Sequence, residues 1–169
     1  MSVVQIASSR STALINGSFE QGPAIPAGDL VIAAGSTALS GWIVTRGDVE
    51  YLGPSWDVPA GARAIDLDGT MPGEISQTFA TTRNQTYVVW FYLSGNPKGA
   101  VVKHVRVTVD GVAADYSFNT SGQTKDVLTW QPINFSFVAS GTSATLTFTS
   151  MSSADSASGA LIDNVSVVQ

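Results

Sequence analysis

The sequence contains no cysteine, a single histidine and no obvious catalytic motif. Without cysteine the chain can form neither a disulfide nor a thiolate metal site. The histidine, His104, falls inside a predicted strand, where a solvated or hydrogen-bonded side chain is the ordinary state. A G-x-S-x-G nucleophile motif is absent, so a hydrolase triad has no visible parts. Carboxylates are few, and for Asp66 and Asp68, which share a strand face, a solvated or hydrogen-bonded edge is favoured over a glycosidase pair. We therefore expect a protein that is not an enzyme.

Positive charge is also scarce. Lysine and arginine number 8 against 13 aspartates and glutamates, which gives a net charge of −5. A protein that binds nucleic acid by neutralising phosphates needs a basic face, so that class is excluded. The sequence has no apolar run of about 18 residues, and this excludes a membrane-spanning helix. The segment Met1 to Ser9 lacks a basic start followed by a long apolar stretch, so no signal peptide is expected there.

The residues that are present suit one packed domain. Hydrophobic residues make up 44% of the 169, and polarity comes from Ser, Thr, Asn, Gln and Gly more than from charge. A chain of this length corresponds to one domain when a domain averages about 150 residues. We expect a single domain over residues 1–169, in which residues 1–12 form an N-terminal extension or an extra strand.

Short apolar runs alternate with polar residues between Gly, Pro, Asn and Asp, which predicts strands and no helix. The clearest strands are 73–80, 86–93, 101–109, 112–118, 132–138, 144–149 and 160–168, and weaker ones are 13–19, 41–44, 48–51 and 63–67. Asp110-Gly111 is a two-residue hairpin signal. Polar segments predict loops at 95–99, 120–126 and 150–159. The fold class that follows is all-β, an antiparallel β-sandwich of the jelly-roll kind.

Alternation along each strand also assigns faces. It places Val105 and Val107 in the core, and it places Asp66 and Asp68 on the outer face of their strand. The run from Tyr87 to Leu93 is apolar at every position, so the pattern allows either register. In one register Trp90 and Tyr92 face outward, and that face must be covered or must bind something.

Aromatic residues in a weakly charged, hydroxyl-rich surface suit sugar binding, because apolar sugar faces stack on rings while hydroxyl groups take hydrogen bonds. Trp56 is the strongest candidate, since it lies in a loop flanked by Gly and Pro. Its ring is either a binding platform or a plug over the core. The other candidate ligand-binding residues are Asp57, Arg63, Asp66, Tyr92 and Asn96, with Trp90 and Arg106 as further possibilities.

Two terminal motifs and five internal ones resemble a known family. The motifs NGSFE at 16–20 and LIDNVSV at 161–167 are similar to those of galactose-binding-like jelly rolls, which include many bacterial carbohydrate-binding modules. The internal motifs resemble the bacterial choice-of-anchor C domain, itself similar to a plant cell-wall domain family. They are GWIV at 41–44, GDVEY at 47–51, AIDLDG at 64–69, PGEISQTF at 72–79 and SGNP at 94–97.

The resemblance implies a jelly roll that binds polysaccharide and acts outside the cell or at its surface. It also implies a structural calcium ion, for which Glu20 and Asp163 match the acidic positions of the two terminal motifs. The alternative is that these two carboxylates only make hydrogen bonds at strand ends. The function expected is that of a non-catalytic, lectin-like module with a glycan as its partner. The alternative is a structural or adhesive module without a site for a small sugar.

Overall fold

The computed structural model describes residues 14–25, 27–154 and 156–169, and within these ranges it contains strands and no helix. The strands are β1 (Leu30–Ala33), β2 (Ile43–Arg46), β3 (Asp48–Tyr51), β4 (Ile65–Asp66), β5 (Glu74–Ala80), β6 (Thr86–Gly95), β7 (Val102–Val109), β8 (Val112–Asn119), β9 (Gln131–Val138), β10 (Ser143–Ser150) and β11 (Ala160–Val168). The described part of the chain has no helix of the length and hydrophobicity that a membrane crossing requires.

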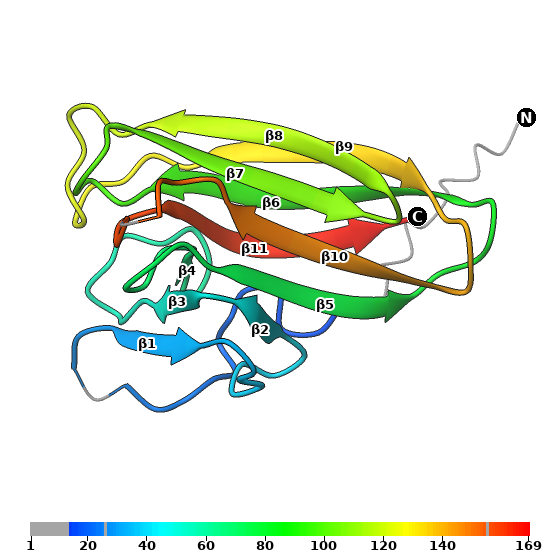
Figure 1. Ribbon diagram of the computed structural model, residues 1–169, viewed down its shortest axis with the longest axis horizontal. Coiled ribbons are helices and arrows are strands. Elements are labelled where there is room, and N and C mark those ends of the chain that lie inside the picture. Colours follow the sequence, from blue (N-terminus) through cyan, green and yellow to red (C-terminus); the bar gives the residue numbers. More distant parts are fainter. Residues whose placement is uncertain (1–13, 26, 155) are drawn as a thin grey trace, which may run out of the picture.

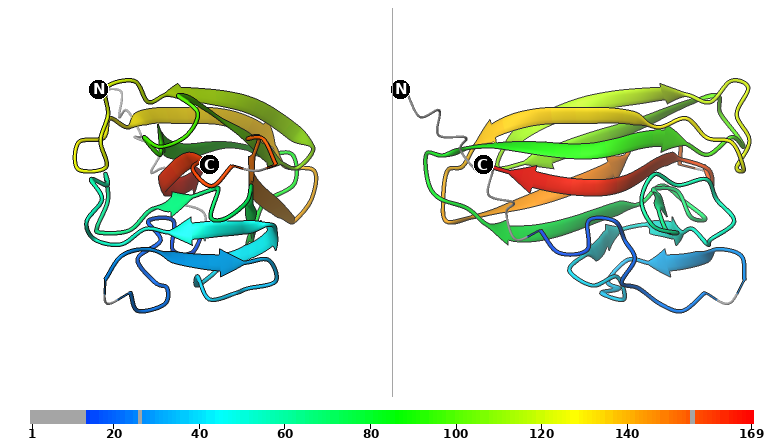
Figure 2. Two further views of the ribbon diagram at one scale, coloured as in Figure 1. Left: turned by 60° about the vertical axis from the view of Figure 1, so that its left-hand side comes forward. Right: turned by 180° about the vertical axis from the view of Figure 1, so that it is seen from behind.

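The strands form two antiparallel sheets that pack face to face (Figure 1). One sheet has six strands in the order β1-β3-β4-β11-β6-β9, and the other has five in the order β2-β5-β10-β7-β8. The view from behind in Figure 2 shows β11 running through the middle of its sheet. The predicted antiparallel sandwich is therefore confirmed.

The main core lies between the two sheets. Val105 and Val107 of β7 are fully buried, as alternation predicts. Burial also decides between the two registers that the sequence allowed for residues 87–93 of β6. Val89 and Phe91 are buried in the core, so Trp90 and Tyr92 lie on the outer face of the six-stranded sheet. The Asp110-Gly111 turn joins β7 to β8 with φ values of 48° and 80°, which is the left-handed geometry that a tight hairpin needs.

A second, smaller core covers part of the outer face of the six-stranded sheet. On β11, Leu161 alternates with Ala160 and Ile162, so its side chain leaves the main core. Four residues from the loops beside it pack against Leu161, namely Leu52, Trp56, Ala64 and Leu128. This face of the sheet is therefore dry near β4 and β11.

All seven of the clearer predicted strands are present, but two differences appear near the N-terminus. The predicted strand 13–19 does not form over its described residues 14–19, because Asn16 and Phe19 take φ values of 54° and 58° and make a turn. Residue 13, like residues 1–12 for which an extension or extra strand was predicted, lies outside the described residues. The strand β1 was not predicted, because its four residues pair with β3 alone and carry a weak alternation.

Trp42 packs against the turn at residues 16–19, and its replacement tests the packing of the core. Its ring lies 5.3 Å from the ring of Phe19 and 6.2 Å from that of Phe148, and its Nε1 donates to the carbonyl oxygen of Asn16 at 3.0 Å. We expect Trp42→Ala to lower the free energy of unfolding by about 3–5 kcal/mol, the usual cost of removing a buried tryptophan. Trp90→Ala is the matched control, and urea denaturation should show less than about 1 kcal/mol of loss for this exposed ring. Equal losses for both variants would contradict the core assignment.

Candidate functional site

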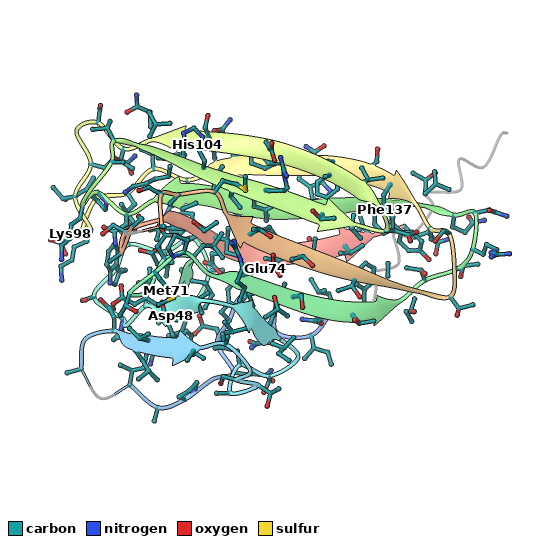
Figure 3. All side chains as sticks on the ribbon, viewed as in Figure 1. Asp48, Met71, Glu74, Lys98, His104 and Phe137 are labelled. Carbon is teal, nitrogen blue, oxygen red and sulfur yellow. The ribbon has the colours of Figure 1, made fainter. Side chains whose placement is uncertain are left out.

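The loops at one end of the sandwich enclose a pocket of about 270 Å³. This end, at the left of Figure 1, gathers the connections β6–β7, β8–β9 and β10–β11. The pocket, called the loop-end pocket below, is lined by Asp29, Trp56, Asn96, Pro97, Lys98 and Lys125. Figure 3 shows Lys98 at the outer limit of this end. Residues from four separate segments therefore converge on a space of the size of one sugar ring.

Trp56 forms a wall of the pocket but offers little of its surface. Its side chain is 8% exposed, and the rest packs on the second core. The indole Nε1 donates to Asp29 Oδ1 at 2.9 Å, and the same oxygen accepts from the backbone N–H of Gly53 at 2.8 Å. The sequence left open whether the Trp56 ring is a binding platform or covers the core. Most of the ring covers the core. A fully exposed stacking platform at Trp56 is not what the structure contains.

The polar groups of the pocket are held in place by neighbouring atoms. Asn96 is 3% exposed, its Nδ2 donates to Asp66 Oδ2 at 2.8 Å, and its Oδ1 accepts from the N–H of Lys98 at 3.0 Å. The Lys125 ammonium reaches the Ser55 hydroxyl at 3.4 Å. A fixed amide, a fixed carboxylate and two ammonium groups thus share one small space, which suits a ligand rich in hydroxyl groups.

A half-buried carboxyl lies close to this pocket. Glu50 of β3 pairs directly with Asp66 of β4 across the sheet. Burial raises the pKa of Glu50, and the negative charge of Asp29 raises it further, while Lys98 lowers it. Lys98 therefore offsets part of the negative charge of the acidic groups around the pocket.

The sequence identified Trp56 and Asn96 in this pocket but missed Asp29, Lys98 and Lys125. The signal for the lysines was available, because the chain has only three and they lie at positions 98, 103 and 125. Lys98 and Lys125 fall in predicted loops, whereas Lys103 falls in the predicted strand 101–109. Asp29 precedes β1, a strand that the pattern did not reveal, so nothing in the sequence placed it.

The remaining predicted ligand residues do not join the pocket. Asp57 Oδ2 accepts from the N–H of Leu128 at 3.0 Å, and its carbonyl accepts from Trp130 Nε1 at 2.8 Å, so it ties two loops together. The Arg63 guanidinium lies over the ring of Tyr51, 5.3 Å from its centroid. Tyr92 is half-buried on the outer face of β6, beside the exposed Trp90, as one of the two registers predicted.

Asp66 and Asp68 correct the prediction that they face solvent, because both are fully buried. Alternation gave the right face of β4, but that face is covered by loops and by the segment before β11. Burial raises the pKa of Asp66 to about 7, against the opposing effect of hydrogen bonds from Asn96, Asp68 and Gly159.

Glu20 and Asp163, the predicted calcium ligands, come together at the loop 60–62. Glu20 Oε1 accepts from the N–H of Ala62 at 2.9 Å, and Asp163 Oδ2 accepts from the N–H of Ala60 at 3.1 Å. Burial raises the pKa of Asp163 to about 7, and the negative charge of Glu20 adds to the rise. Two neighbouring carboxylates that repel each other fit a hard cation, which would neutralise both and fasten β11 to the N-terminal turn. Among the described residues no third Asp, Glu or His joins such a group, so main-chain oxygens and water would complete the coordination.

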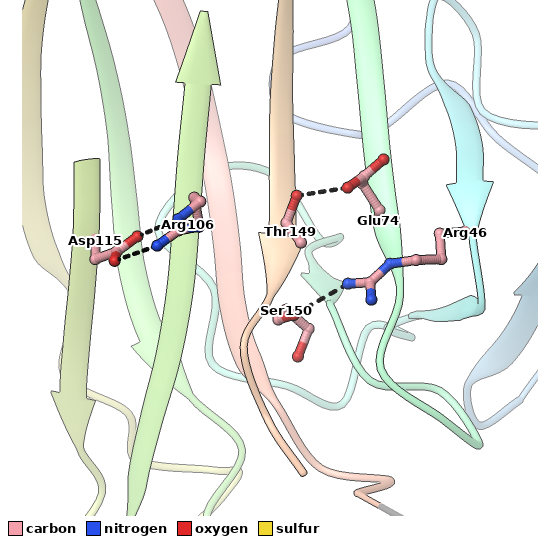
Figure 4. Close-up of polar contacts among 6 residues, drawn as sticks. All are labelled: Arg46, Glu74, Arg106, Asp115, Thr149 and Ser150. Carbon is pink, nitrogen blue, oxygen red and sulfur yellow. Dashed lines mark hydrogen bonds and ion pairs between the residues drawn. The ribbon is translucent and has the colours of Figure 1, made fainter. Parts of the chain in front are cut away.

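A polar groove of about 560 Å³ lies on the outer face of the five-stranded sheet, and sequence reasoning did not find it. One cross-strand row supplies its centre, running Arg46–Glu74–Thr149–Arg106–Asp115 over all five strands. In Figure 4, Glu74 accepts a hydrogen bond from the Thr149 hydroxyl at 2.7 Å, and Arg106 forms an ion pair with Asp115 at 2.7 Å. Arg46 donates to the carbonyl oxygen of Ser150 at 3.2 Å (Figure 4). Only sheet register brings this row together, since its members are spread from residue 46 to residue 149.

Comparison with known proteins places this fold in a family. Residues 12–168 match the family described as "Protein of unknown function (DUF642)". Halomucin from Haloquadratum walsbyi is 31% identical over 158 residues, which cover 91% of this chain and 2% of halomucin. The chain thus spans about 2% of the length of that relative.

Solved structures of similar fold include a family 61 carbohydrate-binding module in complex with β-1,4-galactotriose. It is 19% identical with a TM-score of 0.53, and the match covers 92% of this chain and 97% of the module. An arabinose-bound family 51 α-L-arabinofuranosidase is 14% identical with a TM-score of 0.59, and the match covers 94% of this chain but 26% of the enzyme. Further structures of this fold are carbohydrate-binding modules. At these identities the likeness shows the fold alone.

The buried carboxyls predict how stability depends on pH in the absence of metal. A carboxyl whose pKa rises on folding binds its proton more tightly in the native state, so its contribution is full below about pH 4 and is lost as the pH rises through its folded pKa of about 7. In the presence of a chelator, we expect the free energy of unfolding to fall between about pH 4 and pH 7, and Asp163→Asn to reduce that fall. Added calcium should stabilise the wild type more at pH 7.5 than at pH 5, because the metal requires ionised carboxylates.

Thermal denaturation of wild type, Asp163→Asn and Asp126→Asn, with chelator and with calcium, tests both statements. Asp126 is an exposed aspartate of the β8–β9 connection and serves as the control. A calcium effect that survives Asp163→Asn and Glu20→Gln unchanged would contradict this assignment.

Proposed function

The chain belongs to the family described as "Protein of unknown function (DUF642)". For this member we propose the function of a non-catalytic carbohydrate-binding module. The observation that carries the proposal is the loop-end pocket, where a tryptophan edge, a fixed carboxylate, a fixed amide and two ammonium groups border about 270 Å³. This combination suits one pyranose ring, because hydroxyl groups can both donate and accept while an apolar wall receives the C–H face. The likeness of fold to carbohydrate-binding modules supports the proposal.

Each group has a role in the proposed complex. Asp29 keeps Oδ2 for a sugar hydroxyl, because its Oδ1 is occupied by Gly53 and Trp56. Lys98 and Lys125 donate to further hydroxyl oxygens from opposite loops. The Trp56 edge supplies the apolar contact. A single enclosed ring suggests recognition of a terminal sugar or a side branch, and a module of this kind acts outside the cell or at its surface.

The test is a binding screen followed by substitution in the pocket. We expect the protein to bind a member of a panel of neutral plant and bacterial polysaccharides, measured by affinity electrophoresis and calorimetry. Lys98→Met and Lys125→Met should each raise Kd roughly tenfold, as the loss of a charged hydrogen bond worth about 1.5 kcal/mol would do. Arg83→Met, in the β5–β6 turn at the opposite end of the sandwich, is the matched control and should leave Kd unchanged. Absence of binding to every glycan, or equal Kd for all three variants, would overturn the proposal.

A second candidate function, adhesion between copies of this module, is favoured by the composition of the groove. The groove contains no aromatic residue, and the exposed Met151 borders it. Exposed Met71 lines an adjoining depression that shares Arg46 and Ser150 with the groove. Flexible methionines beside fixed charges are typical of protein-binding surfaces. Sedimentation equilibrium tests this candidate: Arg46→Glu should abolish self-association while Arg83→Glu should not, and a monomer at every concentration would rule it out.

A further inference from the structure

A pair of carboxylates is buried at the end of β4, apart from the predicted calcium ligands Glu20 and Asp163. Asp66 and Asp68 both have an exposed fraction of 0%. The oxygens of Asp66 are fully engaged, because Oδ1 accepts from the N–H of Asp68 at 2.9 Å and of Gly159 at 2.8 Å, and Oδ2 accepts from Asn96 at 2.8 Å. Neither Oδ1 nor Oδ2 of Asp68 has a hydrogen-bond partner. A buried carboxylate with no donor at either oxygen is very unfavourable unless another charge neutralises it.

The two carboxylates face the same point of the chain. A Cβ atom added to Gly159 would lie 2.6 Å from Asp68 Oδ1 and 2.9 Å from Asp66 Oδ1. No side chain can occupy this position without displacing these oxygens, so a glycine here leaves the two oxygens of Asp68 free to bind a ligand. The one other buried side-chain atom without a partner in the described residues is the hydroxyl of Ser94, which stands in the same cross-strand row as Asp66.

Lys103 does not serve as the missing partner. Its side chain is buried, and its Nζ donates to the carbonyl oxygens of Lys98 at 2.5 Å and Ser158 at 2.6 Å. In the part of the chain that the structure describes, the only ion pair within 4.0 Å is that of Arg106 with Asp115, so the ammonium touches neither carboxylate. Two carboxylates and one ammonium leave an excess of negative charge in a region closed to water.

We propose that Asp68 and Asp66 bind a calcium ion at this position. Carboxylate oxygens are the ligands that calcium prefers, and the two unpartnered oxygens of Asp68 can bind the ion together, while the negative charge of Asp66 beside them adds to the attraction. Lys103 lies near enough for both carboxylates to act on its charge but contacts neither, so the ion supplies the positive charge that is still missing. It also fixes the loop-end pocket, because Asn96 joins Asp66 to the pocket by a direct hydrogen bond. The site shares no residue with the Glu20 and Asp163 pair.

The test starts from the double variant Glu20→Gln/Asp163→Asn, which removes the predicted site at the loop 60–62. After removal of metal by chelation, calorimetry with calcium chloride should show one remaining calcium per chain. Adding Asp68→Asn should weaken this binding at least tenfold. Asp126→Asn in the same background is the control, since it removes one exposed carboxylate of equal charge. Calcium binding that Asp68→Asn leaves unchanged, or no binding in the double variant, would overturn the proposal.

A direct measurement covers the case in which a substituted protein does not fold. Crystals of the wild type soaked with terbium chloride should give an anomalous peak within roughly 2.3–2.6 Å of an Asp68 oxygen, the distance range of calcium-like ions. A peak between Glu20 and Asp163 with none at Asp68 would overturn the proposal and indicate that a proton neutralises the buried pair.

Discussion

The pairing of β11 with β4 on one side and β6 on the other is the constraint on which the rest of the structure depends. Leu161 is opposite both Asp66 and Ser94, so one register fixes three strands at once. Because side chains alternate, the same strand sends Ile162 into the main core and Leu161 into the second core. A slip of one residue would exchange these faces and would also move Gly159 away from the buried carboxylates.

Charge in this protein is concentrated where the backbone brings loops together. The chain has few charged residues, yet Asp66, Asp68 and Lys103 are buried within one end of the sandwich and Lys98 lies above them. Burying so many charges opposes folding, and ordinary packing does not recover that free energy. Such an arrangement is understandable if the end of the sandwich holds ligands. The opposite end, with its short β5–β6 turn and β9–β10 turn, carries no comparable group among the described residues.

The sequence predicted strands and faces far better than it predicted exposure. Alternation placed the side chain of Val107 in the core and that of Asp66 on the face of its own sheet that points away from the core, and both assignments are correct. It could not show that loops cover the second face, because that depends on contacts between residues about a hundred positions apart, such as Asp66 with Gly159. The same limit applies to Trp56, whose loop position was recognised but whose burial against Leu161 follows from tertiary packing. The Arg46–Asp115 row was invisible for a related reason, since only the pairing of five strands aligns it.

The loop-end pocket and the buried carboxylates are coupled through a single amide. Asn96 donates to Asp66 below and accepts from the N–H of Lys98 beside the pocket, so its orientation is set from both directions. If the charge on the carboxylates were not neutralised, Asp66 would be half protonated at its pKa of about 7, and its protonated form would accept the Asn96 hydrogen bond more weakly. The loop that carries Lys98 would then lose one of its fixed points. Ligand recognition at the surface and charge neutralisation in the interior are therefore two parts of one arrangement, and they are joined by Asn96.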